Sequence, residues 1–300
     1  MILEFWQGAG DPVRGAAVLV QALAMAGALG AAGSALFLVF LSERLTVEEA
    51  RAVRRWLLLF VLLALLAGAA LWPFRAAALT GVTAGMARVA IYPEIARSPF
   101  GDAAFTLAAG LVLLLFARVR TAWGAGLGTA GALLVCIGLA LAGHAPGHAR
   151  RQEVLALAVI HAAAAAFWFG SLFSLRTVAD RRDPRSAAEA VLAWSRHAMV
   201  FAGLAVASGI ALGLAFAGSP AQLPGSGYGW VVLAKTALVV AMVLGALASR
   251  FRHARLMERG DVLAGDALGA SCNRQILFAL LVLYATAELT TAELPALAAR

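Results

Sequence analysis

Apolar residues occur in eight long runs, and short polar segments separate these runs along the whole chain. Each run has or approaches the roughly 20 residues that a helix needs to cross about 30 Å of hydrocarbon. We therefore predict an all-α bundle of about eight transmembrane helices, forming one integral membrane domain over residues 1–300. The predicted spans are Ala16–Leu41, Trp56–Leu71, Ala103–Phe116, Ala122–Ala142, Val154–Leu175, Ala188–Ala217, Gly229–Leu247 and Ile276–Thr290.

Composition supports a membrane protein and excludes the soluble classes. Hydrophobic residues make up 62% of the chain and charged residues only 13%. A soluble domain has about a quarter charged residues and under half apolar ones. The net charge of +8 comes from arginines in the short connections between the apolar runs. This pattern indicates orientation in a lipid bilayer and does not indicate a nucleic-acid partner.

The arginines are distributed unequally between the two sides of the predicted membrane domain. Fourteen lie in the first, third, fifth and seventh connections, and seven lie on the other side. The larger set is Arg44, Arg51, Arg54, Arg55, Arg118, Arg120, Arg176, Arg181, Arg182, Arg185, Arg250, Arg252, Arg255 and Arg259. Because cytoplasmic loops carry an excess of Lys and Arg, we predict that this set is cytoplasmic and that both termini are periplasmic.

The longest outer connection runs from Trp72 to Asp102. Its apolar residues Met86, Val89, Ile91 and Ile95 interleave with the charged residues Arg88 and Glu94. This pattern predicts a short helix lying at the membrane interface.

Two histidines occur at the outer end of the fourth span, in the sequence GHAPGHA. Pro146 and Gly147 fit the central positions of a type II turn, in which glycine supplies a positive φ. Such a turn would bring His144 and His148 to one outer mouth, where they could share a cation. The alternative is that both are solvated loop residues.

Two more histidines fall inside predicted spans. His161 lies about nine residues into the fifth span, roughly 13 Å below its outer end. An imidazole at that depth needs a partner, which is either a metal ion or a structural contact. Trp168 lies on nearly the same helical face and would shield His161 from lipid. His197 enters the sixth span from the opposite side, and a polar contact on the cytoplasmic side is the alternative for it.

The remaining polar and sulfur-containing residues give weaker signals of a functional site. His253 lies in RFRHAR and is predicted to be solvated. Lys235 and Glu288 lie near the outer ends of their spans and could pair.

Imidazole and thioether are good copper ligands, and thioether favours Cu(I). The methionines and the two cysteines form no ligand pattern, so we expect methionine to act as core filler. The chain has no motif of an enzyme, and none is predicted.

The stretch from Gly143 to Leu175 resembles the CopD family of bacterial inner-membrane copper-handling proteins. The matching positions there are Gly143, His144, Ala145, His161, Trp168 and Gly170. Trp194–Ala198, Ser208–Gly209, Tyr228, Gly229 and Lys235 resemble later elements of the family, with Leu223–Tyr228 as the loop before the seventh span. The resemblance is best over residues 141–255, although the family often has leucine where His197 stands.

The resemblance implies copper resistance or copper uptake across the bacterial inner (cytoplasmic) membrane. A copper ion, Cu(I) or Cu(II), would be the cargo, and His144, His148, His161 and His197 would be its candidate ligands. A periplasmic CopC-like copper carrier would be the donor. Two other functions stay open from the sequence. One is a b-type haem protein with His161 and His197 as axial ligands, and the other is a metal-free assembly factor.

Overall fold

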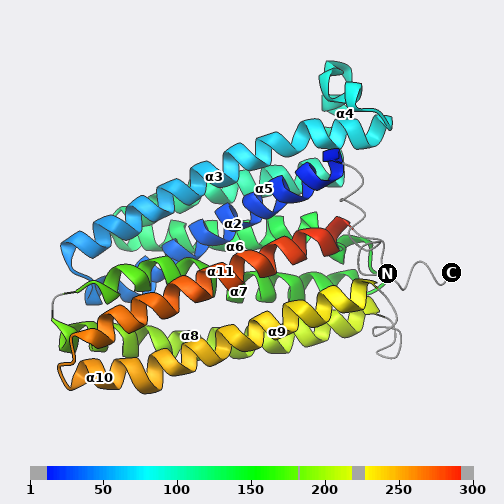
Figure 1. Ribbon diagram of the computed structural model, residues 1–300. Coiled ribbons are helices and arrows are strands. Elements are labelled where there is room, and N and C mark those ends of the chain that lie inside the picture. Colours follow the sequence, from blue (N-terminus) through cyan, green and yellow to red (C-terminus); the bar gives the residue numbers. More distant parts are fainter. Residues whose placement is uncertain (1–11, 182, 218–226, 292–300) are drawn as a thin grey trace.

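The computed structural model describes residues 12–181, 183–217 and 227–291. Within this part eight helices are long and apolar enough to cross a membrane, which confirms the prediction from the apolar runs. They lie side by side as an all-α bundle (Figure 1). The long helices are α2 (Pro12–Leu41), α3 (Val47–Thr80), α5 (Pro99–Leu114), α6 (Ala122–Ala142), α7 (Arg151–Ala179), α8 (Pro184–Ala217), α9 (Gly227–Ala248) and α11 (Leu263–Thr291).

Several helices are longer than the apolar runs that predicted them. The run Trp56–Leu71 lies inside α3, which begins directly after Thr46. Thr46 accepts a hydrogen bond from the Glu49 amide at 3.2 Å, and Glu49 accepts one from the Thr46 amide at 2.9 Å. This capping box starts the helix among polar residues, before the apolar run. Gly81, with φ of 69°, ends it.

The predicted interfacial helix forms only in part. The short helix α4 (Tyr92–Ala96) contains the buried Ile95, whereas Met86 and Val89 lie in separate 3-10 turns. Val89 is 78% exposed. The amphipathic pattern therefore does not continue through one helix.

The core of the bundle surrounds α2, which packs against α3, α5, α6, α7 and α11. α2 and α7 approach most closely at Gly33 and Gly170. A Cβ atom on Gly33 would lie 1.8 Å from the carbonyl oxygen of Ala166, and one on Gly170 would lie 2.6 Å from the Gly33 Cα. Only residues without a side chain permit this crossing, so the core depends on both glycines.

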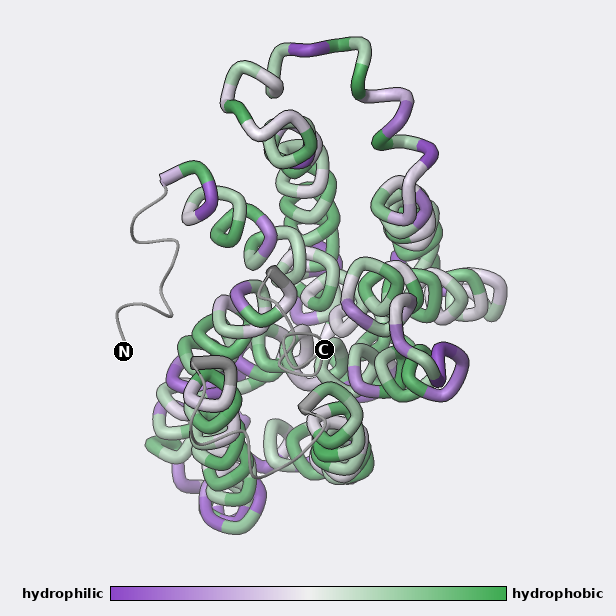
Figure 2. Tube along the Cα trace, turned by 90° about the vertical axis from the view of Figure 1, so that its right-hand side faces the viewer, coloured by the Kyte–Doolittle hydropathy of each residue, from purple (hydrophilic) through white to green (hydrophobic). Residues whose placement is uncertain are grey.

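The two ends of the bundle differ in chemistry. The segments 42–46, 115–121, 179–181 and 249–262 lie at one end, called here the arginine-rich end and drawn at left in Figure 1. The opposite end, which carries residues 144–148, is called the histidine end. In the end-on view of Figure 2, hydrophobic positions dominate the helices and hydrophilic positions are frequent in the connections.

One buried ion pair holds the arginine-rich end together. Arg181 donates to the two carboxylate oxygens of Glu49 at 2.8 and 2.6 Å, and to the carbonyl oxygen of Arg44 at 3.0 Å. The side chains of Arg181 and Glu49 are only 10% and 8% exposed. The pair therefore joins the connection between α2 and α3 to the connection between α7 and α8.

Which end faces the cytoplasm stays a prediction from the arginine bias. The chain ends, which we predict to be periplasmic, lie outside the described residues, as do residues 223–226 of the predicted loop Leu223–Tyr228.

Candidate functional site

His144 and His148 lie at the histidine end, on either side of a 3-10 turn, Ala145–Gly147. The ring centroids of His144 and His148 are 6.1 and 6.0 Å from that of Phe216, near the end of α8. Both imidazoles therefore pack against one aromatic ring at the histidine end. The predicted type II turn is wrong, because Gly147 does not have a positive φ. The amides of Gly147 and His148 donate to the carbonyl oxygens of His144 and Ala145 and form a 3-10 turn.

The ring of His148 has a partner on each nitrogen. Its Nδ1 accepts a hydrogen bond from the Arg150 amide at 3.0 Å, and its Nε2 lies 3.3 Å from the carbonyl oxygen of Ala215. A carbonyl only accepts, so the proton lies on Nε2. His148 could therefore bind a metal ion only by exchanging one of these contacts.

His161 has a different arrangement, with one nitrogen held and the other without a partner. Its Nδ1 lies 3.1 Å from the carbonyl oxygen of Ala205 and 3.2 Å from Oγ of Ser208. The Ser208 hydroxyl donates within its own helix to Leu204, so Nδ1 is the donor to both oxygens. Nε2 then carries the lone pair, and it makes no hydrogen bond to any described residue.

Glycine at position 209 makes room for this ring. A Cβ atom there would lie 3.2 Å from Cε1 of His161 and 3.5 Å from its Nδ1. The Ser208–Gly209 pair thus supplies both an acceptor for the imidazole and the space in which it lies.

Lys235 on α9 acts on His161 through a Coulombic interaction between the ammonium and the ring. The predicted ion pair between Lys235 and Glu288 does not form. Lys235 makes no ion pair or hydrogen bond with the described residues. Glu288 instead accepts a hydrogen bond from the Tyr284 hydroxyl at 3.2 Å. The two residues therefore lie in separate environments although both are near the histidine end.

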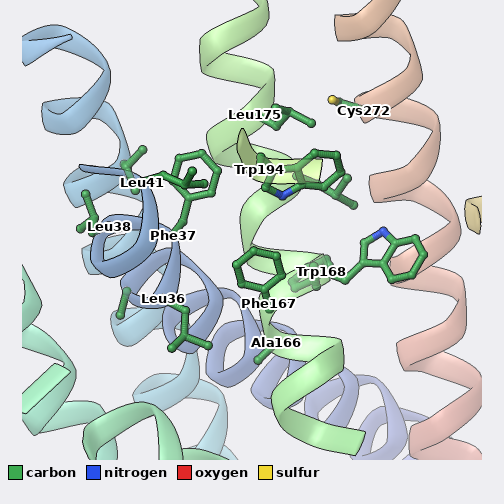
Figure 3. Close-up of a cluster of buried hydrophobic side chains, with 14 of the residues drawn as sticks. Leu36, Phe37, Leu38, Leu41, Ala166, Phe167, Trp168, Leu175, Trp194 and Cys272 are labelled. Atoms are coloured by element: carbon green, nitrogen blue, oxygen red, sulfur yellow. The ribbon is translucent and has the colours of Figure 1, made fainter. Parts of the chain in front are cut away.

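Trp168 does not cover His161, and that prediction is wrong. Figure 3 shows its indole pointing toward α11, the helix that carries Cys272. The indole N–H donates to Oε1 of Gln275 on α11 at 3.4 Å, whereas His161 contacts α8. Seven residues of helix place the two side chains on nearly one face, but the rings extend toward different neighbours. Trp168 therefore belongs to the buried core.

His197 also lies on α8, nearer the arginine-rich end. Its ring stacks on Phe40 with centroids 5.1 Å apart at an angle of 23°. Its Nδ1 lies 3.1 Å from the carbonyl oxygen of Ala193 in the preceding helical turn. The proton is therefore on Nδ1, and Nε2 carries the lone pair, as in His161.

His161 and His197 are too far apart to share one ion. His161 contacts Ala205, which is eight residues from His197 and so about 12 Å away along α8. Two nitrogen ligands of one metal ion lie about 4 Å apart at most, given bond lengths near 2 Å. The structure does not bring the two histidines together as axial ligands of one haem. Within the described ranges no group of three or more His, Cys, Asp or Glu side chains could hold a metal.

His253 is not solvated, contrary to the prediction from its basic surroundings. It is 9% exposed and lies in the π-helical turn η8 (Ser249–His253), which joins α9 to α10 (Ala254–Glu258). Ser249 and Met257, one turn away on either side, are buried with it. The basic residues around His253 give no signal of this burial in the sequence.

Two family models match the chain. The model described as copper resistance protein D-like, N-terminal domain, matches residues 12–149, and the model described as copper resistance protein D matches residues 188–289. The chain belongs to the copper resistance protein D family. The family match extends over the first four spans as well as the last three, and is broader than the resemblance over 141–255. Searches of curated proteins and of solved structures gave no match.

Not all of the candidate histidines lie within the segments that match this copper resistance family. His144 and His148 lie in the N-terminal match and His197 in the C-terminal one. His161 lies between them, on α7, where neither model matches. The family shows a multi-pass membrane protein with a role in copper resistance, and its description names no catalytic activity.

Proposed function

We propose that this protein carries copper into or across the bacterial inner membrane along the interface of α7 and α8, using histidines as successive ligands. The observation that carries the proposal is the His161 ring, whose Nδ1 is held by Ala205 and Ser208 while Nε2 has a lone pair and no partner among the described residues. Metal-binding histidines are oriented in this way, by a hydrogen bond from the nitrogen that does not bind the ion.

The four histidines define three levels along α8. His148 contacts Ala215, His161 contacts Ala205, and His197 is part of α8 itself. These levels are about 15 and 12 Å apart at 1.5 Å per residue. An ion would first meet His144 and His148 at the histidine end, and His148 would release Ala215 to bind it. His161 and then His197 would offer their Nε2 atoms deeper in the bundle.

Two features would keep the ion from staying at one level. The ammonium of Lys235 acts on the His161 ring, so a bound cation would be repelled there. The second feature is the pair of stacked rings of Phe167 and Phe201, whose centroids are 4.3 Å apart. Phe201 lies midway along α8 between His197 and Ala205, so these rings would offer the ion no ligand between the levels of His161 and His197. Conduction requires binding that is weak enough for release. Copper would be the cargo, as Cu(I) or Cu(II), and a periplasmic CopC-like carrier would be its donor.

Copper analysis of the purified protein tests the proposal. His161→Ala should lose most of the bound copper, measured as the copper-to-protein ratio by mass spectrometry after dialysis. His253→Ala should retain it, because His253 lies at the arginine-rich end and is not one of the proposed ligands. Retention of copper by a His144→Ala/His161→Ala double variant would contradict the proposal.

Reporter fusions test the orientation on which the route depends. A reporter active only in the periplasm should be active when fused after Arg300 and inactive when inserted near Arg182. The opposite pattern would place His144 and His148 on the cytoplasmic side and reverse the direction of access.

A further inference from the structure

One hollow region of the arginine-rich end contains none of the candidate copper ligands. It is a cavity of about 380 Å³ between η8, α10 and the first turns of α11. Arg252, His253 and Leu256 line one side, and Asp261, Leu263 and Arg274 line the other. Cavities of roughly 300 Å³ and more are large enough to hold small ligands.

His253 supplies the first indication of a ligand. Its side chain is buried, and its Nδ1 has no hydrogen-bond partner. Buried polar atoms in folded proteins are nearly always hydrogen-bonded, so His253 is an exception at the wall of this cavity. The π-helical turn that carries His253 is also unusual, because π-bulges are rare and occur frequently at functional sites.

The charges around His253 indicate the sign of that ligand. Arg252 and Arg274 both act on the His253 ring through Coulombic interactions. Neither guanidinium makes an ion pair or hydrogen bond with any residue that the structure describes. The one acidic side chain of the lining, Asp261, accepts a hydrogen bond from the Leu263 amide at 2.9 Å. The cavity therefore offers two unpaired guanidinium groups and an imidazole to an anion.

The remaining lining is apolar and lies at the level where the bilayer begins. Leu256, Leu263, Ala264 and Ala267 form this wall. The uninterrupted apolar run of α11 starts at Ile276, directly after Arg274 and Gln275. An amphiphilic anion could thus place its charged group between the arginines and its chain against the first turns of α11.

We infer that this cavity binds a phosphate group, held by the guanidinium groups of Arg252 and Arg274 beside the His253 ring. Arginine matches phosphate oxygens with two parallel N–H donors, and basic pockets between transmembrane helices bind anionic headgroups. The phosphate belongs either to an anionic phospholipid of the surrounding leaflet or to a soluble phosphate. The site does not depend on copper transport, because none of its lining residues is a candidate copper ligand.

Native mass spectrometry and thermal unfolding of the purified full chain test this site. The probes are phosphatidylglycerol, phosphatidylcholine and inorganic phosphate, and the variants are Arg274→Gln and His253→Gln. Arg259→Gln is the matched control, because it removes the same charge from an exposed position at the same end of the bundle without lining the cavity. Arg274 is exposed, so its substitution should not prevent folding.

Wild-type protein should bind phosphatidylglycerol in preference to phosphatidylcholine, whose choline group the arginines repel. Arg274→Gln should weaken this binding about fivefold, the usual effect of one basic residue at a membrane surface, and Arg259→Gln should not. If inorganic phosphate alone raises the unfolding temperature, with the same dependence on the variants, the site takes soluble phosphate. Binding of both probes unchanged in Arg274→Gln and His253→Gln, or weakened equally by Arg259→Gln, would overturn the inference.

Discussion

α2 and the pair α8 and α9 differ sharply in how they pack. Of the most apolar stretch of α2, 72% is buried inside the bundle, whereas the corresponding stretches of α8 and α9 are each 6% buried. The α2 interior consists mainly of alanine, glycine and leucine. α8 and α9 instead carry Ser208, His197 and Lys235. The part of the molecule that holds the fold together is therefore not the part that carries its polar chemistry.

This division has a physical reason. A polar group at membrane depth must have a partner, and a densely packed helix has no room to rearrange around a passing ion. α7 belongs to both regions, since Gly170 packs on α2 while His161 faces α8. Packing against α2 thus holds α7 in place, and the side chains of α8 contact the other face of α7. Substitutions in the two regions should accordingly affect different properties.

The largest effect on folding is expected at the crossing of α2 and α7. Gly33→Leu places a side chain where its Cβ alone would lie 1.8 Å from the Ala166 carbonyl oxygen. The helices would have to separate, and we expect a loss of at least about 4 kcal/mol of unfolding free energy, or no folded protein. Gly68→Leu on α3 is the control, because nothing lies within 4 Å of its Cβ position. Fluorescence-detected size exclusion after heating measures both, and equal losses would refute a specific crossing.

The buried ion pair at the arginine-rich end should have the next largest effect. Glu49→Ala leaves the Arg181 guanidinium buried without its carboxylate and removes the capping box, so we expect a loss of about 3 kcal/mol. Glu153→Ala removes the exposed pair with Arg150, whose side chains are 65% and 68% exposed, and should cost under about 1 kcal/mol. Thermal unfolding in detergent measures the difference. A similar loss in both variants would mean that burial adds nothing to the Glu49–Arg181 pair.

The sequence predicts spans far better than it predicts contacts between side chains. Long apolar runs identify membrane helices because every buried backbone group must be hydrogen-bonded within the helix. Which neighbour a side chain meets depends on helix packing. Trp168 and His161 share a face in the sequence pattern, but Trp168 contacts α11 and His161 contacts α8. Lys235 and Glu288 were predicted at similar depths in the membrane, but they do not form an ion pair. The burial of His253 depends on a π-helical turn that no local pattern specifies.

In the loosely packed region, Ser208→Ala should weaken copper binding with little effect on folding. The variant leaves the carbonyl oxygen of Ala205 as the only acceptor for His161 Nδ1–H. Loss of such an orienting contact typically lowers metal affinity about tenfold or more, and removal of one hydrogen bond costs about 1 kcal/mol of stability. Thr236→Ala on α9 removes a hydroxyl that bonds only to Val232 and serves as control. Competition with a copper chelator gives the affinities, and equal values in both variants would argue against His161 as the ligand.

Lys235→Met should strengthen copper binding, whereas Ser208→Ala weakens it. This is the smallest of the expected effects. The ammonium acts on the His161 ring and has no ion-pair partner among the described residues, so it repels a cation bound at Nε2. Its removal should tighten copper binding about fivefold, or ~1 kcal/mol for charges screened as in a protein. Glu288→Gln should leave copper affinity unchanged, and the two substitutions should add in stability within about 0.5 kcal/mol, because the side chains do not pair. Weaker copper binding in Lys235→Met would instead make the lysine part of the copper site and would contradict the repulsion between its ammonium and the bound ion.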